Sequence, residues 1–246
     1  MTQRTGAFRT RMRSTLLNDP YLYDRLLEAA EQAHLFLRDQ IIVRMGCESG
    51  ARIHEILCLS LGDWRKRGYG REVLSFNKSK MDQQVKLLCF SPQTRELLLR
   101  YIDGERKQHD PQRRDLALLT DTDALFLSGR GRTYGYGAFL LHWKRLCQVA
   151  GITFPPSGLR HWFAIQALLQ IEERTNNPTD GELVKKVLVQ YLGWQSPDVF
   201  ETDDHMLFLK RLEEESMKVH DLNQPVPIDE VCKLPASIEP CPHSPP

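Results

Sequence analysis

Two arginines, Arg52 and Arg160, each stand just after a small-residue turn and at the start of an expected helix. Ser49-Gly50 precedes Arg52, and Ser157-Gly158 precedes Arg160. The first turn of a helix favours an anion over a cation, because its free N–H groups carry partial positive charge. A bound phosphate would resolve the conflict, since the guanidinium and those N–H groups can hold it together. The repetition predicts two halves of one anion-binding site; the alternative for Arg52 is a solvated side chain that pairs with Glu55.

Two lysines, Lys78 and Lys80, lie in the polar turn of an expected β-hairpin. Residues 73–76 and 85–90 are rich in strand-forming apolar side chains, and residues 77–82 between them are polar. Lysines at such a tip can reach a phosphate. The alternative is that they keep the hairpin soluble and contact nothing.

The composition excludes several classes of protein. The six cysteines, at 47, 58, 89, 147, 232 and 241, form no C-x-x-C pair, which argues against a disulfide framework and a structural zinc site. The eight histidines form no metal-binding motif, so we expect no metal and no cofactor. No apolar run is long enough to cross a membrane, and residues 1–6 begin no signal peptide. We therefore expect a cytoplasmic protein.

Charge is distributed unevenly along the 246 residues, although the formal net charge is only +1. The first four charged side chains are all arginines, at positions 4, 9, 11 and 13, whereas acids gather between residues 201 and 215. A basic arm can give a neutral protein a local basic face that suits nucleic acid. The alternative is a solvated chain end.

Apolar periodicity predicts an α+β protein, mainly α-helical with a small antiparallel β-sheet. We expect one helix or two abutting helices over residues 20–45, then the helix that Arg52 opens. Further helices are expected over about 92–108, 139–150, 160–169, 182–192 and 198–217, with a short strand at 124–127. The domains expected are a flexible basic arm (1–18), one folded domain (19–218) and a proline-rich disordered tail (219–246).

Taken together, these segments resemble the catalytic domain of tyrosine recombinases, the phage-integrase family, over roughly residues 20–210. Residues 49–57, SGARIHEIL, look like the family's T-G-x-R-x-x-E motif. The hairpin with Lys78, Val85 and Leu87 is similar to K-x-x-x-x-R-x-V-P-L. Residues 157–161, SGLRH, are similar to H-x-L-R-H, and Leu192-Gly193-Trp194 looks like the L-G-H/W box.

The resemblance implies phosphoryl transfer on double-stranded DNA, in DNA integration and site-specific recombination by a mobile genetic element. In such a site Arg52 and Arg160 would neutralise the scissile phosphate, with Lys78 and Lys80 also on the DNA backbone. Lys78 would protonate the leaving 5′ oxygen, and Trp194 would donate a further hydrogen bond. A late tyrosine would attack to form a 3′-phosphotyrosyl bond without a metal. A homo-oligomer or partner recombinase on DNA and a nucleoid location are also implied.

Two positions depart from the family pattern. Ser157 occupies the histidine position of the second arginine motif; it can donate a hydrogen bond but is no base at neutral pH. Asp203 occupies the position of the nucleophilic tyrosine, nine residues after Trp194, and His205 is retained two residues further on. An aspartate there would repel a phosphodiester by roughly 1–4 kcal/mol at about 4 Å. We therefore expect a DNA-binding protein that is defective in strand cleavage.

Three alternatives follow. The chain could be an active strand-transferase whose nucleophile is His205 or comes from a partner subunit. It could instead be a helical interaction module whose arginines form internal ion pairs, such as Arg52 with Glu55. The family also places a core-binding domain before the catalytic domain, whereas about eighteen residues precede it here. The third possibility is therefore a truncated or minimal homologue, or one whose missing half a second protein supplies.

Overall fold

The computed structural model describes residues 16–76, 85–174 and 178–193, and all structural statements below concern these residues. Helices dominate, and the sheet is a single antiparallel pair, β1 (Glu72–Phe76) and β2 (Val85–Cys89), with Glu72 opposite Cys89 and Phe76 opposite Val85. The predicted fold class is therefore confirmed. Residues 77–84, which include Lys78 and Lys80, lie outside the described residues, as do residues 1–15 of the expected arm (1–18), the expected helix at 198–217 and the tail.

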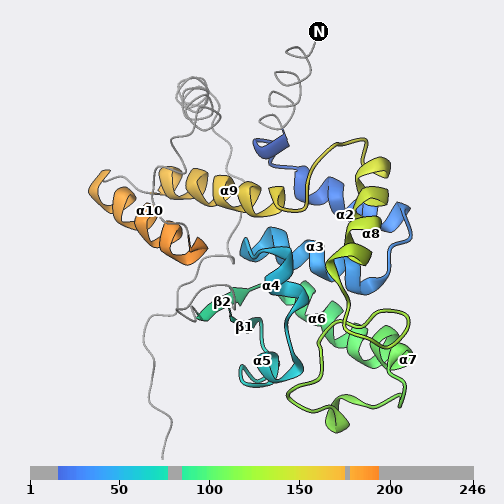
Figure 1. The fold of residues 1–246 in the computed structure, drawn as a ribbon. Coiled ribbons are helices and arrows are strands. Elements are labelled where there is room, and N and C mark those ends of the chain that lie inside the picture. Colours follow the sequence, from blue (N-terminus) through green and yellow to red (C-terminus); the bar gives the residue numbers. More distant parts are fainter. Residues whose placement is uncertain (1–15, 77–84, 175–177, 194–246) are drawn as a thin grey trace, which may run out of the picture.

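The central element is helix α3 (Leu37–Ser49), which is covered on most sides by α2 (Leu22–Gln32), α6 (Pro92–Tyr101) and α9 (Gly158–Arg174) (Figure 1). Its apolar residues Ile41, Ile42 and Met45 are fully buried. The expected segment 20–45 is thus two helices. They separate at His34, whose positive φ of 49° is incompatible with a continuous right-handed helix.

The other helices surround α3 and the helices that cover it, and several of them are only three to five residues long. They are α4 (Ile53–Leu57), α5 (Leu61–Arg65), the π-helix η1 (Ile102–Arg106), α7 (Lys107–His109), the 3₁₀-helix η2 (Leu116–Leu118), α8 (Tyr136–Val149) and α10 (Pro178–Leu192). Helices α6, η1 and α7 together form the helix predicted at 92–108. Ser91 caps it, because its hydroxyl accepts the Thr94 N–H, and Pro92 occupies the first helical position.

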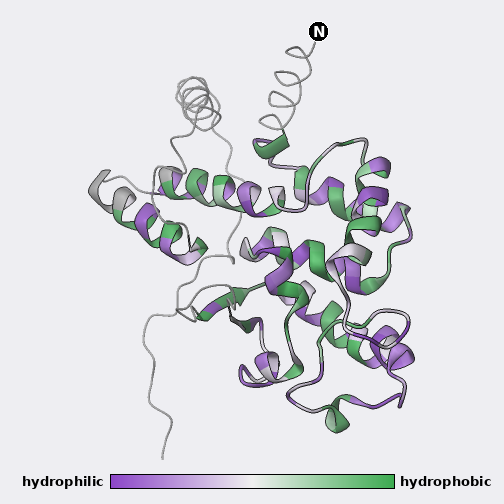
Figure 2. Cartoon of the chain, in the orientation of Figure 1, coloured by the Kyte–Doolittle hydropathy of each residue, from purple (hydrophilic) through white to green (hydrophobic). Residues whose placement is uncertain are grey.

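Helices α9 and α10 form a second, smaller apolar cluster, in which α9 contributes Ala164 and Leu168 and α10 contributes Leu188, Val189 and Leu192. Both helices are longer than the predicted ranges of 160–169 and 182–192, since α9 continues to Arg174 and α10 begins at Pro178. Both helices carry a mixture of apolar and polar residues along their length, as expected for helices that bury one face (Figure 2). This packing fixes the end of α10 relative to α9.

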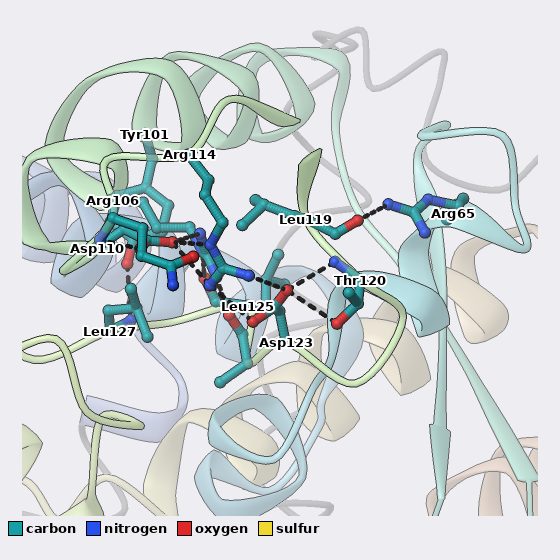
Figure 3. A network of polar contacts seen from close by, with 12 residues as sticks. Arg65, Tyr101, Arg106, Asp110, Arg114, Leu119, Thr120, Asp123, Leu125 and Leu127 are labelled. Atoms are coloured by element: carbon teal, nitrogen blue, oxygen red, sulfur yellow. Dashed lines mark hydrogen bonds and ion pairs between the residues drawn. The ribbon is translucent and has the colours of Figure 1, made fainter. Parts of the chain in front are cut away.

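The prediction of a strand at 124–127 is wrong. Ala124 and Leu127 form only isolated bridges, to Ser60 and Thr133. Side chains bind the backbone groups that a neighbouring strand would otherwise have paired. The buried Arg106 guanidinium donates to the carbonyls of Ala124 and Leu125, and the Leu127 amide donates to the Tyr101 hydroxyl (Figure 3).

Ion pairs hold the segment that leads into residues 124–127. Arg114 donates to the carboxylates of both Asp110 and Asp123, at 2.9–3.0 Å, and Asp123 also accepts the backbone N–H of Thr120 (Figure 3). The connection from α7 to α8 is therefore an ordered part of the fold although it contains little regular secondary structure.

Candidate functional site

Arg52 lies at the turn between α3 and α4. Gly50 ends α3 with a left-handed φ of 58°, and Arg52 is the residue before the first residue of α4, with extended backbone angles. The prediction that Arg52 lies within the first helical turn is off by one residue. Glu55 reaches back to it: its carboxylate accepts the Arg52 backbone N–H at 2.9 Å and Nη1 at 2.8 Å.

The expected contribution of helix N–H groups to phosphate binding is small at Arg52. Helix α4 has five residues, too few to build a substantial dipole, and Glu55 already carries negative charge at its start. The Arg52 side chain nevertheless remains 45% exposed despite its pair with Glu55. The local ion pair is therefore real, and it orients a guanidinium that solvent still reaches.

Arg160 lies in the first turn of α9 and is buried, with 6% exposure. Its Nη1 donates to the Gly50 carbonyl at 2.9 Å, across 110 residues of sequence. Burial, together with the nearby positive charge of Arg52, lowers the pKa of Arg160 to about 10. The structure thus brings the two arginines together, as the repeated pattern predicts.

A glycine under an aromatic ring precedes each arginine by two residues. A Cβ on Gly50 would lie 2.3 Å from Cδ1 of Phe163, and one on Gly158 would lie 2.4 Å from Cζ of Phe154. Neither position has room for a side chain. Close packing of these rings against the backbone therefore fixes the backbone position two residues before each arginine.

Lys86 is a residue of this site that the sequence analysis missed. Its Nζ lies 3.4 Å from the Gly50 carbonyl and 3.9 Å from Oε2 of Glu55, and its side chain is only 12% exposed. Strand alternation was the signal that could have found it. Lys86 shares a face of β2 with the fully buried Leu88, so its side chain has to point inward.

Tyr191, near the end of α10, completes the surroundings. Its hydroxyl donates to the Ser49 carbonyl at 2.9 Å, and its ring lies 4.5 Å from Nζ of Lys86. Its ring also packs against that of Phe163, at 6.3 Å between centroids. The end of α3 is consequently held by side chains from β2, α9 and α10.

The charges in this cluster shift the pKa values of Glu55, Lys86 and Arg160. Burial lowers the pKa of Lys86 to about 7, helped by the charges of Arg160 and Arg52 and opposed by Glu55. Burial alone would raise the pKa of Glu55, but the Arg52 amide and the charges of Lys86 and Arg52 bring it below its usual value. Glu55 therefore stays ionised, and a bound anion would relieve the repulsion among the three cations.

The remaining predicted site residues are only partly placed. Ser157 is exposed in the turn directly before α9, three residues from Arg160. Lys78, Lys80, Trp194, Asp203 and His205 lie outside the described residues. Trp194 directly follows Gly193, the last described residue after α10. In the described part of the chain, no group of His, Cys, Asp and Glu side chains has a metal-binding arrangement.

A model of the phage integrase family matches residues 19–171, a stretch that contains Arg52, Lys86 and Arg160. The chain belongs to the phage integrase family. This is the family of tyrosine recombinases, proteins of DNA recombination and integration, to which the sequence motifs pointed. A comparison with curated protein sequences gives no match.

Solved structures of recombinases share the fold of this integrase-family chain. A crystal structure of XerA recombinase matches with a TM-score of 0.54 and 20% identity, over 78% of this chain and 62% of that one. XerH site-specific recombinase bound to palindromic difH substrate, in a post-cleavage complex, matches with a TM-score of 0.58 and 18% identity, over 81% and 52%. The pre-cleavage XerH complex with difH gives 0.55 and 18%, over 83% and 54%.

The integrase-family chain spans roughly half to three-fifths of the length of these recombinases. The likeness at such identities concerns the fold, and the roles of individual side chains need their own argument. Among the helices of the described residues, none has the length and apolarity that a bilayer span requires.

Proposed function

We propose that this protein binds double-stranded DNA by holding a backbone phosphate between Arg52 and Arg160, and that it acts in DNA integration and site-specific recombination. The observation that carries the proposal is the convergence of the two arginines, 108 positions apart, at the end of α3. Guanidinium groups suit this task because their planar N–H donors match the oxygens of a phosphate.

The partners of each arginine support a binding role. Glu55 and the Gly50 carbonyl each engage an Nη1 atom, so they orient the guanidiniums from the protein side. In the proposal Ser157, which is exposed before α9, donates a further hydrogen bond to an anion at Arg160. In the proposal Lys78 and Lys80 contact the same DNA backbone from the hairpin turn, and Trp194 donates one more hydrogen bond.

In the proposed function the chain lacks its own cleaving nucleophile, because Asp203 stands where the family motif has tyrosine. Attack by a carboxylate on phosphorus would give an acyl phosphate, which water hydrolyses, and the bond energy needed for rejoining would be lost. Binding without cleavage fits an accessory or regulatory role beside a complete recombinase. The competing proposal is cleavage through His205 or through a tyrosine of a partner subunit.

We expect the double variant Arg52→Ala/Arg160→Ala to bind duplex DNA about a hundredfold more weakly at ~0.1 M salt, because two charge-assisted contacts are lost. The slope of log affinity against log salt should fall by about one, since one phosphate is released from contact. Fluorescence anisotropy with a labelled duplex over a salt series measures both quantities.

Arg67→Ala is the matched control for the binding experiment. The Arg67 side chain is 42% exposed and ion-paired with Glu72, much as Arg52 is 45% exposed and paired with Glu55. Unchanged DNA affinity in the double variant would overturn the proposed phosphate site. Loss of the circular dichroism spectrum would instead assign the arginines a structural role, and the exposed Arg52→Ala alone would then test binding in a folded protein.

A further inference from the structure

Lys86 lies inside the site rather than at its edge. Its ammonium group shares the Gly50 carbonyl with Arg160, at 3.4 Å and 2.9 Å respectively, and lies 3.9 Å from the Glu55 carboxylate. The ring of Tyr191 covers it at 4.5 Å, so that 12% of the side chain remains exposed. Any anion that binds to the Arg160 guanidinium is consequently close to a second cationic group, the mostly buried ammonium of Lys86.

The groups that face Lys86 come from four elements. Arg52 precedes α4, Glu55 lies on α4, Arg160 on α9 and Tyr191 on α10, while the Gly50 carbonyl ends α3. Two guanidiniums and one carboxylate thus surround the ammonium group, and burial removes much of its hydration. In this environment the pKa of Lys86 falls to about 7, so the free protein holds it partly neutral at physiological pH.

We propose that Lys86 is the third cation of the phosphate site and that it takes up a proton as a DNA phosphate binds beside Arg52 and Arg160. The inference rests on the proposed function and adds a residue to it. A phosphodiester brings a full negative charge next to the ammonium group, which favours the charged form. By linkage, the same interaction makes DNA affinity depend on the protonation of Lys86.

This role differs from the one that the family motif gives to Lys78. Lys78 belongs to the segment between the strands, outside the described residues, whereas Lys86 lies within β2 opposite Ser75, on the face that packs against the end of α3. In the family motif the Lys86 position carries proline, which has no charge. Lys86 therefore adds a titrating group to the site rather than replacing the hairpin lysine.

A residue with this role should reduce the stability of the free protein. An unfolded lysine titrates near ~10.4, whereas Lys86 in the folded protein titrates near 7. Between these values the unfolded chain binds more protons, so folding stability rises as pH increases from about 7 to about 10. Lys86→Met, which keeps an unbranched side chain without the charge, should unfold at a higher temperature than wild type at neutral pH.

We would test the inference on the full chain with labelled double-stranded DNA of mixed sequence, at constant ionic strength. Wild-type affinity should fall about tenfold as pH rises from about 7 to about 9, because binding takes up on average about half a proton over this range. Lys86→Met should bind more weakly than wild type at about pH 7 and lose most of this pH dependence. Lys144→Met, at an exposed position of α8, is the matched control and should behave as wild type.

Two results would overturn the role of Lys86 alone: the same pH dependence in wild type and Lys86→Met, or a lower melting temperature of Lys86→Met with unchanged DNA affinity. Absence of DNA binding by wild type at every pH would instead overturn the proposed function, and the inference with it. The pH dependence of wild-type stability relative to Lys86→Met is measured without DNA and so tests the buried ammonium group separately.

Discussion

Asp203→Tyr is expected to turn a protein that leaves no covalent complex with DNA into one that does. The substitution restores the family's nucleophile nine residues after Trp194. In the restored reaction the tyrosine hydroxyl gives its proton to water as its oxygen bonds to the phosphorus, the bond from phosphorus to the 5′ oxygen breaks, and that oxygen takes a proton from Lys78. Adduct formation should rise by on the order of a hundredfold or more, given what removal of a nucleophile costs enzymes.

The structure supports this prediction at the point where the chain leaves α10. Tyr191 binds the Ser49 carbonyl, and the end of α10 packs on α9, which carries Arg160. The last described turn of α10, from which the chain continues toward Asp203, is therefore fixed at the end of α3.

Covalent capture measures the outcome. Wild type, Asp203→Tyr and Asp203→Phe would each be incubated with labelled, nicked duplexes from the flanks of the gene, and denaturing gels would reveal any adduct. Asp203→Phe is the matched control, because it supplies the ring without the hydroxyl. We expect an adduct with Asp203→Tyr alone, and its loss when Arg160→Ala is added.

Two results speak against this expectation. An adduct with wild type that disappears in Arg160→Ala would show a catalytically active enzyme, with His205 or a partner's residue as nucleophile. An Asp203→Tyr protein that binds the duplex but leaves no adduct would show that the site lacks more than its tyrosine.

Gly50→Ala is expected to cost about 2–5 kcal/mol of stability and to abolish DNA binding. A left-handed residue with a Cβ costs about 1–2 kcal/mol. The Cβ would also lie 2.3 Å from Phe163, and overpacking of that kind costs about 1–3 kcal/mol. Any movement that relieves the clash displaces the carbonyl to which Arg160 and Lys86 bind. Urea unfolding and DNA binding measure the two effects.

Gly68→Ala separates backbone strain from the clash. Gly68 has a similar φ of 62°, but a Cβ there would meet no atom within 4 Å, so only the backbone cost of about 1–2 kcal/mol is expected. Adding Phe163→Leu to Gly50→Ala should recover part of the lost stability. Equal costs at Gly50 and Gly68 would show that Phe163 does not constrain the turn.

Local patterns predicted those parts of the site that depend on local structure. A glycine two residues before an arginine, at the start of a helix, occurs twice, and the two copies meet in the fold. The hairpin strands and the helix that follows Ser91-Pro92 were also readable, because alternation and capping residues act over a few positions. The family motifs then added order and spacing that single patterns lack.

Long-range contacts explain what local patterns could not predict. Residues 124–127 have the composition of a strand, but Arg106 and Tyr101, about twenty residues earlier, bind their backbone groups instead. In the sequence, Lys86 interrupts an apolar run and looks like an ordinary strand residue. Its partners, Gly50, Glu55 and Tyr191, come from three other elements, and only the folded chain assembles them.

The carbonyl groups at the end of α3 give this site an unusual counter-charge. The last turn of a helix leaves carbonyls without helical partners, and together they carry about half of a negative charge. Arg160, Lys86 and Tyr191 donate to or cover these groups at Ser49 and Gly50. The carbonyls at the end of a helix can thus hold cations in place, and they neutralise these cations less than another carboxylate beside Glu55 would. Most of the positive charge of the cations would remain available to attract DNA. The buried helix α3 would therefore influence the electrostatic potential of the DNA-binding surface.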